Sequence, residues 1–214
     1  MRDRPGVTLM SDITAALRGD LGATIAGHAK GVFISFEGGE GSGKSTQSKL
    51  LKEYLEAQGH IVTLTREPRG TKLGKELREI LLHTHDHVAP RAEALLYAAD
   101  RAHHVETLIR PALERGEIVI TDRYLDSSIA YQGAGRVLSP GEIGRISRWA
   151  TESLIPTLTI IIDLPAEIGL SRLKSRDRLE SESTTFHERV RQEFLSLALL
   201  DPDRYLVVDG RENI

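Results

Sequence analysis

Residues 38–45 read Gly-Gly-Glu-Gly-Ser-Gly-Lys-Ser and fit the pattern G-x-x-x-x-G-K-[ST]. An apolar run, residues 32–36, precedes this loop, and a segment with helical periodicity, residues 44–57, follows it. Glycines let the backbone turn its N–H groups toward phosphate oxygens, and the start of the helix adds the positive end of its dipole. A chance glycine-rich turn would lack this strand–loop–helix context. The motif therefore predicts a nucleoside triphosphate site.

The side chains of this loop predict individual roles. Lys44 can reach the outer phosphates of the nucleotide, and the Ser45 hydroxyl can ligate Mg²⁺. Asp122 follows another apolar run, residues 118–121, at the position where such sheets carry the carboxylate that orders the metal. The alternative role for Asp122 is a helix N-cap. The residues expected to bind the nucleotide are Gly38, Gly39, Glu40, Gly41, Ser42, Gly43, Lys44, Ser45 and Thr46.

Five short runs rich in Ile and Val alternate along the chain with segments of helical periodicity. The runs are apolar on both faces, as in strands that helices cover on each side. The expected strands are residues 32–36, 61–65, 118–121, 159–162 and 205–208. The expected helices are residues 44–57, 72–82, 91–115, 142–154 and 166–199, the last one broken near Arg176.

This alternation predicts an α/β fold of the P-loop NTPase type. Its core would be a doubly wound, parallel, five-stranded sheet with helices on both faces. Ligands of such sheets bind beyond the carboxyl ends of the strands. The residues just after each run are therefore the candidates for chemistry.

Composition excludes several classes of protein. Hydrophobic residues make up 40% and charged residues 28% of the chain, a balance that excludes wholesale disorder. The net charge of −3 disfavours a nucleic-acid partner. The longest stretch without Asp, Glu, Lys or Arg, residues 153–162, is far too short to span a membrane. The absence of cysteine excludes a disulfide scaffold and fits a reducing compartment, so we expect a cytoplasmic protein with no membrane partner.

The chain divides into two parts of unequal length. Residues 1–30 hold several glycines that interrupt any helix, and they predict a flexible N-terminal extension. Residues 31–214 carry all the motifs and predict one domain.

The nucleotide site alone leaves the activity open. A GTPase switch needs an Asn-Lys-x-Asp element, but the one asparagine, Asn213, is followed only by Ile214, which excludes that class. The basic segment 172–191 could be a mobile lid or a solvated helical face. A kinase of a small acceptor and a regulatory module that hydrolyses its nucleotide slowly both remain. Arginines favour the kinase, because guanidinium groups bind phosphate in a bidentate manner; the candidates are Arg66, Arg78, Arg101 and Arg123.

Four segments of the chain resemble those of bacterial thymidylate kinases, a branch of the P-loop nucleoside monophosphate kinases, in the same order and spacing. They are residues 36–45, residues 66–68 (Arg-Glu-Pro), residues 95–101 (Leu-Leu-Tyr-Ala-Ala-Asp-Arg) and residues 122–133, which begin Asp-Arg-Tyr and end Ala-Tyr-Gln-Gly. The resemblance implies transfer of the γ-phosphoryl group of ATP to dTMP, giving dTDP, with Mg²⁺ as a cofactor and usually in a homodimer. A kinase of another nucleoside monophosphate is the alternative enzyme.

The resemblance also implies which residues bind the base and the sugar of dTMP. The ring of Tyr97 would stack on thymine, and Arg101, one helical turn later, would donate to a thymine carbonyl. Ser128 and Gln132 would line the pyrimidine edge. Tyr131 would lie beneath the deoxyribose.

Around the acceptor phosphate, the resemblance implies a second group of residues. Arg78 and Arg123 would clamp that phosphate, Glu40 would read the sugar 3′-hydroxyl, and Glu67 would lie beside the metal and the phosphate. The residues expected to bind dTMP are Glu40, Glu67, Pro68, Arg78, Tyr97, Arg101, Arg123, Ser128, Tyr131 and Gln132.

Members of the family differ in the source of a further catalytic arginine. The loop of residues 38–45 holds no arginine, so a short lid at about residues 172–182 is expected to supply one, with Arg176 and Arg178 as candidates. Arg172 resembles a residue that packs against the adenine of ATP. The residues expected to act in catalysis are Lys44, Arg123, Arg176, Arg178 and Glu40.

Residues 68–70 read Pro-Arg-Gly, where the family usually has Pro-Gly-Gly. Glycine is favoured where the backbone angle φ is positive. If this position has such a backbone, Arg69 is strained; alternatively, Arg69 adds a contact to phosphate.

Overall fold

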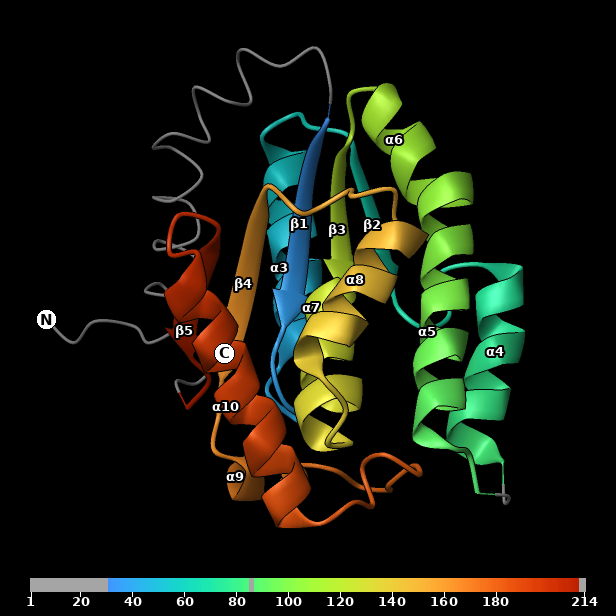
Figure 1. Ribbon diagram of the computed structural model, residues 1–214. Helices are drawn as coiled ribbons and strands as arrows, with labels where there is room; N and C mark the ends of the chain where they lie inside the picture. Colours follow the sequence, from blue (N-terminus) through green and yellow to red (C-terminus); the bar gives the residue numbers. More distant parts are fainter. Residues whose placement is uncertain (1–30, 85–86, 212–214) are drawn as a thin grey trace, which may run out of the picture.

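The computed structural model describes residues 31–84 and 87–211 (Figure 1). Five parallel strands form one sheet in the order β2-β3-β1-β4-β5. The strands are β1 (Val32–Glu37), β2 (Val62–Arg66), β3 (Ile118–Asp122), β4 (Leu158–Asp163) and β5 (Tyr205–Asp209). The predicted five-stranded parallel sheet is confirmed, and each strand overlaps the run predicted for it. The expected flexible extension, residues 1–30, lies outside the described residues.

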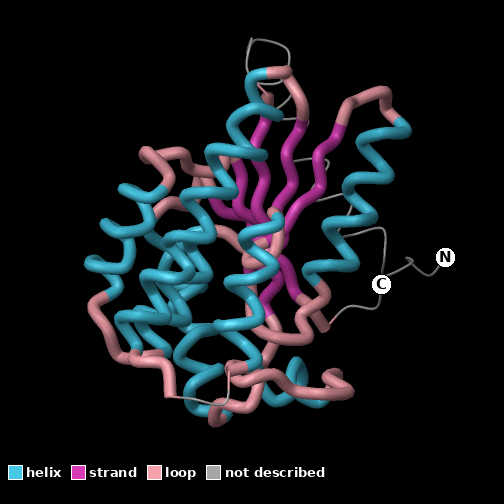
Figure 2. Tube along the Cα trace, turned by 90° about the vertical axis from the view of Figure 1, so that its right-hand side faces the viewer, coloured by secondary structure: helices cyan, strands magenta, loops and turns pink. Residues whose placement is uncertain are grey.

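Helices cover both faces of this sheet. In Figure 1, α3 lies behind the strands and α5, α7, α8 and α10 lie in front, and Figure 2 shows the strands from the side, between the two layers. Within the described ranges, none of the helices has the length and apolar character needed to cross a membrane. The helical segments are α3 (Lys44–Ala57), α4 (Lys72–His83), α5 (Pro90–His104), the π-helical turn η1 (Val105–Ile109), α6 (Arg110–Glu114), α7 (Leu125–Ser128), the π-helical segment η2 (Ile129–Gly135), α8 (Pro140–Ala150), α9 (Ala166–Ser171) and α10 (Thr184–Leu200).

Alternate residues of the central strand β1 face opposite layers. On one side, Ile34 and Phe36 pack in an apolar cluster with Leu51 of α3. On the other side, Phe33 packs edge-on against the ring of Tyr124, with the ring centroids 4.9 Å apart. Burying an apolar side chain of this size contributes about 1.5–3 kcal/mol. Both layers therefore hold β1, and the loop that follows it, at the centre of the molecule.

The structure corrects the predicted helix 91–115. This stretch consists of α5, η1 and α6 instead of one continuous α-helix. Pro111 explains the interruption, because proline has no N–H to donate to the carbonyl four residues earlier and its ring clashes with that carbonyl. The three parts still follow one another along a common direction in Figure 1.

The predicted helix 142–154 is shifted toward the N-terminus. α8 begins at Pro140, after Ser139, whose hydroxyl accepts a hydrogen bond from the N–H of Glu142 at 3.4 Å. Serine at the N-cap followed by proline is a favourable start for a helix. The helix ends before Ser153, whose φ of 59° is incompatible with an α-helix.

Sequence periodicity did not predict α7 and η2, which come soon after β3. All residues from 125 to 135 except Ala134 are buried. Such a segment has no exposed polar face, so it lacks the amphipathic pattern by which a helix is recognised in a sequence.

Residues 172–183 connect α9 to α10 without a helix or strand and lie at the carboxyl ends of the strands (Figure 1). The predicted helix 166–199 is interrupted here, close to the expected break. The Asp177 carboxylate accepts hydrogen bonds from the N–H groups of Leu179 and Glu180, both at 2.9 Å, which stabilises a turn. We call residues 172–183 the lid.

Glu37, the last residue of β1, joins the sheet to the segment after β3. Its buried carboxyl group accepts hydrogen bonds from the N–H of Tyr124 at 2.8 Å and from the hydroxyl of Ser127 at 2.6 Å. Burial, reinforced by the nearby Asp126, raises the pKa of Glu37 to about 8. The folded protein therefore favours the protonated carboxyl group, whereas the unfolded chain favours the carboxylate.

We expect Glu37→Gln to remove a loss of stability that the unmodified protein shows as the pH rises from mildly acidic values to about 8. The folded pKa of Glu37, about 8, lies above the unfolded value of 4.5, so the unmodified protein loses stability as the pH rises between these values. Glutamine has a similar shape and does not titrate. The free energy of unfolding of the variant should therefore rise relative to that of the unmodified protein, by up to about 1.4 kcal/mol per pH unit.

Urea unfolding between about pH 5 and about pH 8 measures this difference. Glu53→Gln, on the exposed part of α3, is the matched control and should follow the unmodified protein. Parallel stability profiles for Glu37→Gln and the unmodified protein would contradict the expectation.

Candidate active site

The loop after β1 is shaped by a close backbone approach. Gly41 has a φ of 64°, and a Cβ atom there would lie 2.1 Å from the carbonyl oxygen of Gly169. A Cβ atom on Gly169, in α9, would lie 2.1 Å from the carbonyl oxygen of Glu40. Only glycine fits at both positions. The loop therefore packs directly on α9, while its last glycine, Gly43, is the N-cap of α3, so the predicted phosphate site lies at the start of a helix.

Lys44 lies over this loop. Its Nζ donates hydrogen bonds to the carbonyl oxygen of Gly39 at 2.6 Å and to the hydroxyl of Ser42 at 3.3 Å. Burial, together with the positive charge of Arg123, lowers the pKa of Lys44 to about 8, although Glu40 opposes the shift. A bound phosphate would favour the charged ammonium group.

Ser45 and Asp122, the predicted metal ligands, meet between α3 and β3. The Ser45 hydroxyl donates a hydrogen bond to the Asp122 carboxylate, and Arg66 donates to the same carboxylate oxygen at 3.4 Å. Hydroxyl and carboxylate oxygens suit Mg²⁺, which takes few protein ligands and completes its shell with phosphate oxygens and water. The pair therefore fits Mg²⁺. Asp122 is not a helix N-cap, because the N-cap of α7 is Tyr124.

One pocket beside the loop collects every residue predicted to bind dTMP. These residues are Glu40, Glu67, Pro68, Arg78, Tyr97, Arg101, Arg123, Ser128, Tyr131 and Gln132. They come from the loop after β1, the end of β2, the helices α4 and α5, and the segment after β3. The lid also lines the pocket, with Asp177, Leu179 and Glu180. Sequence reasoning missed these lid residues, because no local pattern records which pocket a connecting segment covers.

Glu40, Arg123 and Tyr131 form one hydrogen-bonded group between the loop and the pocket. Arg123 Nη2 and the Tyr131 hydroxyl both donate to Glu40 Oε1, each at 2.7 Å. Arg123 Nη1 donates to the carbonyl oxygen of Gly38 at 3.2 Å. Although burial opposes the shift, the charges of Arg123 and Lys44 lower the pKa of Glu40 to about 2, so its carboxylate is ionised. Arg123 therefore contacts the loop and the pocket at once.

Positive charge is concentrated around the acceptor pocket. Burial lowers the pKa of Arg66, and the neighbouring charges of Arg69, Arg78 and Arg123 lower it further, while Asp122 opposes the shift. Like charges that lie this close repel one another unless an anion binds between them. The cluster supports the predicted clamp for an acceptor phosphate.

Arg101 is almost fully paired within the protein. Its Nε donates to Glu67 at 2.8 Å, and its Nη1 donates to Ser128 at 3.1 Å and to Ser147 at 3.3 Å. Its Nη2 donates to the carbonyl oxygen of Tyr124 at 3.1 Å. These bonds use four of the five N–H hydrogens of a guanidinium group. Arg101 is therefore held rigidly at the pocket with one donor left for a ligand.

Glu67 was expected beside the metal and the phosphate. In the structure, one oxygen of its carboxylate accepts the hydrogen bond from Arg101. Its second oxygen lies 3.0 Å from Nδ1 of His104, and Nε2 of His104 lies 2.7 Å from the hydroxyl of Thr65. Glu67, Arg101 and His104 are all buried. Both oxygens of Glu67 are thus engaged by side chains behind the pocket.

Tyr97 and Arg101 lie one helical turn apart on α5, and both line the pocket. The ring of Tyr97 belongs to an apolar cluster that also contains Leu82 and Tyr131. The ring is thus partly a core residue and partly a wall of the pocket, which is compatible with stacking on a base.

Arg69 has the positive φ that the family glycine would accommodate. Its φ is 114°, in a region that side chains other than glycine rarely adopt. Holding a residue there costs about 1–3 kcal/mol. The strain that the sequence suggested at this position is therefore present in the structure.

The two lid arginines differ in their surroundings. Arg178 Nε donates to the carbonyl oxygen of Leu81 at 2.8 Å, and its Nη2 donates to Glu93 at 2.5 Å. Arg176 is exposed. Arg172, predicted on the adenine side, donates to the carbonyl oxygen of Gly41 at 3.1 Å, so it lies against the phosphate-binding loop.

Sequence reasoning missed Glu93, which is fully buried in the first turn of α5. It accepts hydrogen bonds from Gln132, Arg136 and Arg178. The available signal was one carboxylate within an otherwise apolar stretch, residues 92–99. A charge at such a place must find partners once the helix is buried.

The sequence of this chain is similar to the sequences of known proteins. The family model described as thymidylate kinase matches residues 36–214. A thymidylate kinase of Clavibacter sepedonicus is 64% identical over 184 residues, which cover 84% of this chain and 87% of that protein. A thymidylate kinase of Bifidobacterium longum is 54% identical over 189 residues, covering 86% of this chain and 92% of that protein.

A solved structure agrees with these sequence matches. The crystal structure of thymidylate kinase from Ehrlichia chaffeensis aligns with a TM-score of 0.71 and 35% identity, covering 83% of this chain and 92% of that one. The family match extends from the end of β1 through the pocket and the lid. On sequence and fold together, this chain belongs to the thymidylate kinase family.

Proposed function

We infer that this chain is an enzyme that transfers the γ-phosphoryl group of ATP to dTMP, giving dTDP and ADP. Membership of the thymidylate kinase family is the basis for assigning this reaction. The observation in the structure that supports it best is the convergence of all the residues predicted for dTMP on one pocket beside the phosphate-binding loop. The two alternatives, a kinase of another nucleoside monophosphate and a weak ATP-binding module, gain no support from the relatives.

Recognition of the base follows from the fixed groups of the pocket. The ring of Tyr97 stacks on the pyrimidine, and the free N–H of Arg101 donates to a thymine carbonyl. Ser128 accepts a hydrogen bond from Arg101, so its own hydroxyl hydrogen is available to the base edge. Gln132 supplies an amide at the same edge, and Tyr131 supports the deoxyribose. Because these side chains are held by the protein, little ordering is needed when dTMP binds.

Transfer relies on charge and positioning. The acceptor phosphate is itself the nucleophile, so no strong base is needed, and the transition state spreads negative charge over the equatorial oxygens. Lys44 stabilises that charge from the donor side, and Arg123 stabilises it from the acceptor side. The ionised carboxylate of Glu40 holds Arg123 in place and reads the 3′-hydroxyl.

Mg²⁺ is the cofactor that the site accommodates. Ser45 and Asp122 would hold it, directly or through water, and its charge would neutralise the phosphates of ATP. Residues 38–46 and Arg172 would surround the rest of the nucleotide.

The surface and the composition of the chain support proposals on its oligomeric state and its location. Leu95 of α5 and Trp149 of α8 are 58% and 82% exposed, and apolar and aromatic side chains are common in the buried centre of protein interfaces. We propose that a second copy of the chain covers them in a homodimer. The lack of cysteine supports a cytoplasmic location.

The acceptor is tested by ADP release with dTMP, dUMP, dCMP, dGMP and AMP. We expect rapid turnover with dTMP and far slower turnover with the purine nucleotides, because the pocket is built from groups that match a pyrimidine edge. ADP release that does not depend on the acceptor would identify a nucleotide-hydrolysing module instead.

Arg123→Ala tests the clamp on the acceptor side. We expect kcat/KM for dTMP to fall by about 10²–10³, because a charge-stabilising donor is lost from the transition state. The Kd for ATP, measured without dTMP by calorimetry, should change far less. Arg115→Ala, which removes an exposed arginine paired with Glu117, is the control. Equal losses in ATP binding and turnover would contradict the role on the acceptor side.

Substitutions of the two lid arginines should affect different kinetic parameters. Arg178 is engaged by Glu93, so Arg176 is the better candidate to reach the transferred group. We expect Arg176→Ala to lower kcat by about 10³ or more with little change in the KM for dTMP. Arg178→Ala should chiefly raise that KM, because it loosens the lid over the pocket. A kcat that is unchanged in Arg176→Ala would remove this residue from the transfer step.

A further inference from the structure

Glu93 is a buried carboxylate that the reaction as described above does not use. Its Oε1 accepts hydrogen bonds from Gln132 Nε2 at 3.0 Å and from Arg136 Nε at 3.2 Å. Its Oε2 accepts from Arg136 Nη2 at 3.2 Å and from Arg178 Nη2 at 2.5 Å. The side chain is fully buried, so these donors are its environment. Three of the four donor atoms belong to arginine side chains, whose positive charge favours the ionised form of Glu93. An ionised carboxylate has no hydrogen to donate, so it acts only as an acceptor.

An acceptor-only partner determines which way the Gln132 amide points. The amide has a donor end, Nε2, and an acceptor end, Oε1, of similar size. Only Nε2 can face an ionised carboxylate. Although burial opposes the shift, hydrogen bonds from Arg136, Gln132 and Arg178 lower the pKa of Glu93, which keeps the carboxylate ionised. Glu93 therefore forces the acceptor end of Gln132 away from itself.

The pocket lies on the other side of this amide. Gln132 is 2% exposed and lines the pocket together with Arg101 and Ser128. Among the residues that the structure describes, Glu93 is the one recorded partner of the Gln132 amide. Oε1 of Gln132 is thus an unused acceptor, beside the donors of Arg101 and Ser128 on the same wall.

A donor beside an acceptor matches one class of pyrimidine. Thymine and uracil carry a carbonyl at position 4 and an N–H at position 3, which are an acceptor and a donor. Cytosine carries an amino group and an unprotonated nitrogen at these positions, which are a donor and an acceptor. Buried hydrogen-bonding groups that face the wrong partner reject a ligand strongly, because both groups lose their hydrogen bonds to water without replacement.

We propose that Glu93 is a positioning residue for base specificity, which holds the Gln132 amide with its oxygen toward N3–H of the pyrimidine and so excludes cytosine nucleotides. This inference rests on the proposed function, because it takes Gln132 as a reader of the base. Arg178 of the lid donates to the same carboxylate, so the group that orients the amide also contacts the lid.

Glu93→Gln is the direct test. The side-chain oxygen of glutamine can replace Oε2 and accept from Nη2 of Arg136 and Nη2 of Arg178. Its NH₂ group would then take the place of Oε1, where it faces Gln132 and turns that amide around, while Nε of Arg136 loses its acceptor. The measurement is the ratio of kcat/KM for dTMP to that for 5-methyl-dCMP, which keeps the 5-methyl group and reverses the pattern at positions 3 and 4. We expect this ratio to fall by about tenfold or more in Glu93→Gln.

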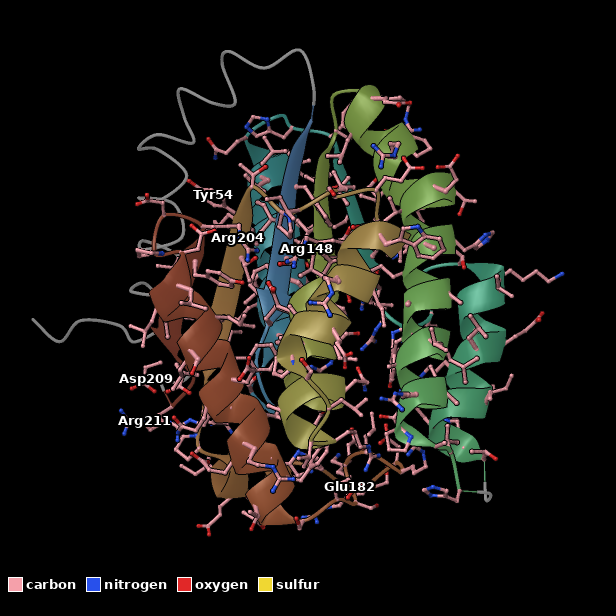
Figure 3. The ribbon with its side chains drawn as sticks, viewed as in Figure 1. Tyr54, Arg148, Glu182, Arg204, Asp209 and Arg211 are labelled. Carbon is pink, nitrogen blue, oxygen red and sulfur yellow. The ribbon has the colours of Figure 1, made fainter. Side chains whose placement is uncertain are left out.

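Glu182→Gln is the matched control. Glu182 projects from the lid (Figure 3) and pairs with Arg136, the same arginine that Glu93 binds, without a hydrogen bond to Gln132. It should loosen the network and leave the dTMP to 5-methyl-dCMP ratio within about twofold of the unmodified enzyme. If Glu182→Gln lowers the ratio as much as Glu93→Gln, or if Glu93→Gln lowers kcat/KM equally for both nucleotides, the proposal is wrong.

Gln132→Ala separates this inference from the function on which it rests. If Gln132→Ala loses selectivity while Glu93→Gln keeps it, the base is read by Gln132 and only the role of Glu93 fails. If Gln132→Ala keeps full selectivity, the proposed reading of the base fails as well. Should Glu93→Gln not fold, a neutron crystal structure of the unmodified enzyme with dTMP, which locates the amide hydrogens of Gln132, decides. Nε2 of Gln132 on Glu93 with Oε1 at N3–H supports the proposal, and the reverse orientation overturns it.

Discussion

The parallel pairing of β1 with β3 is the constraint on which the site depends. Phe36 lies opposite Asp122 in the register, and the N–H of Arg123 donates to the carbonyl oxygen of Phe36 at 2.9 Å. Because both strands end at the same level, the phosphate-binding loop and the Asp122–Arg123 turn leave the sheet side by side. The contact between Ser45 and Asp122 and the ion pair between Glu40 and Arg123 both follow from this placement. A slip of one residue would move these groups apart by about 3.3 Å.

Around that edge, buried carboxylates determine where the donors of the pocket point. Glu37 accepts a hydrogen bond from the segment after β3, Glu67 accepts one from Arg101, and Glu93 accepts one from the Gln132 amide. Each is 3% exposed or less. A carboxylate or carboxyl group in such a place is stable only when its hydrogen-bond partners are complete, so each one fixes the geometry of its neighbours. The polar shape of the acceptor site is thus set by Glu67, which lines the pocket, and by Glu37 and Glu93, which lie behind its walls.

Local patterns carried the prediction of the fold and of much of the site. The loop at residues 38–45 and the five apolar runs depend on neighbours in the sequence, and the strands were found within about two residues. The set of dTMP residues came from the resemblance to a known family, and the structure brings them to one pocket. Their individual roles stay predictions.

The remainder could not be read from the sequence, because it depends on contacts between distant residues. Arg178 and Glu93 are 85 positions apart, and no local feature pairs them. The buried segment 125–135 has no polar face to mark its period. Pro111 was visible in the sequence. However, the sequence does not distinguish a proline that ends a helix from one that is preceded by a π-helical turn and followed by more helix.

The mutual approach of Gly41 and Gly169 has a mechanical consequence. Each of these glycines leaves no room for a side chain against the backbone of the other segment, so the phosphate-binding loop and α9 lie backbone against backbone. The lid begins where α9 ends. A movement of the lid that preserves this contact would therefore pivot on the C-terminal side of α9 and leave the cradle for the triphosphate in place.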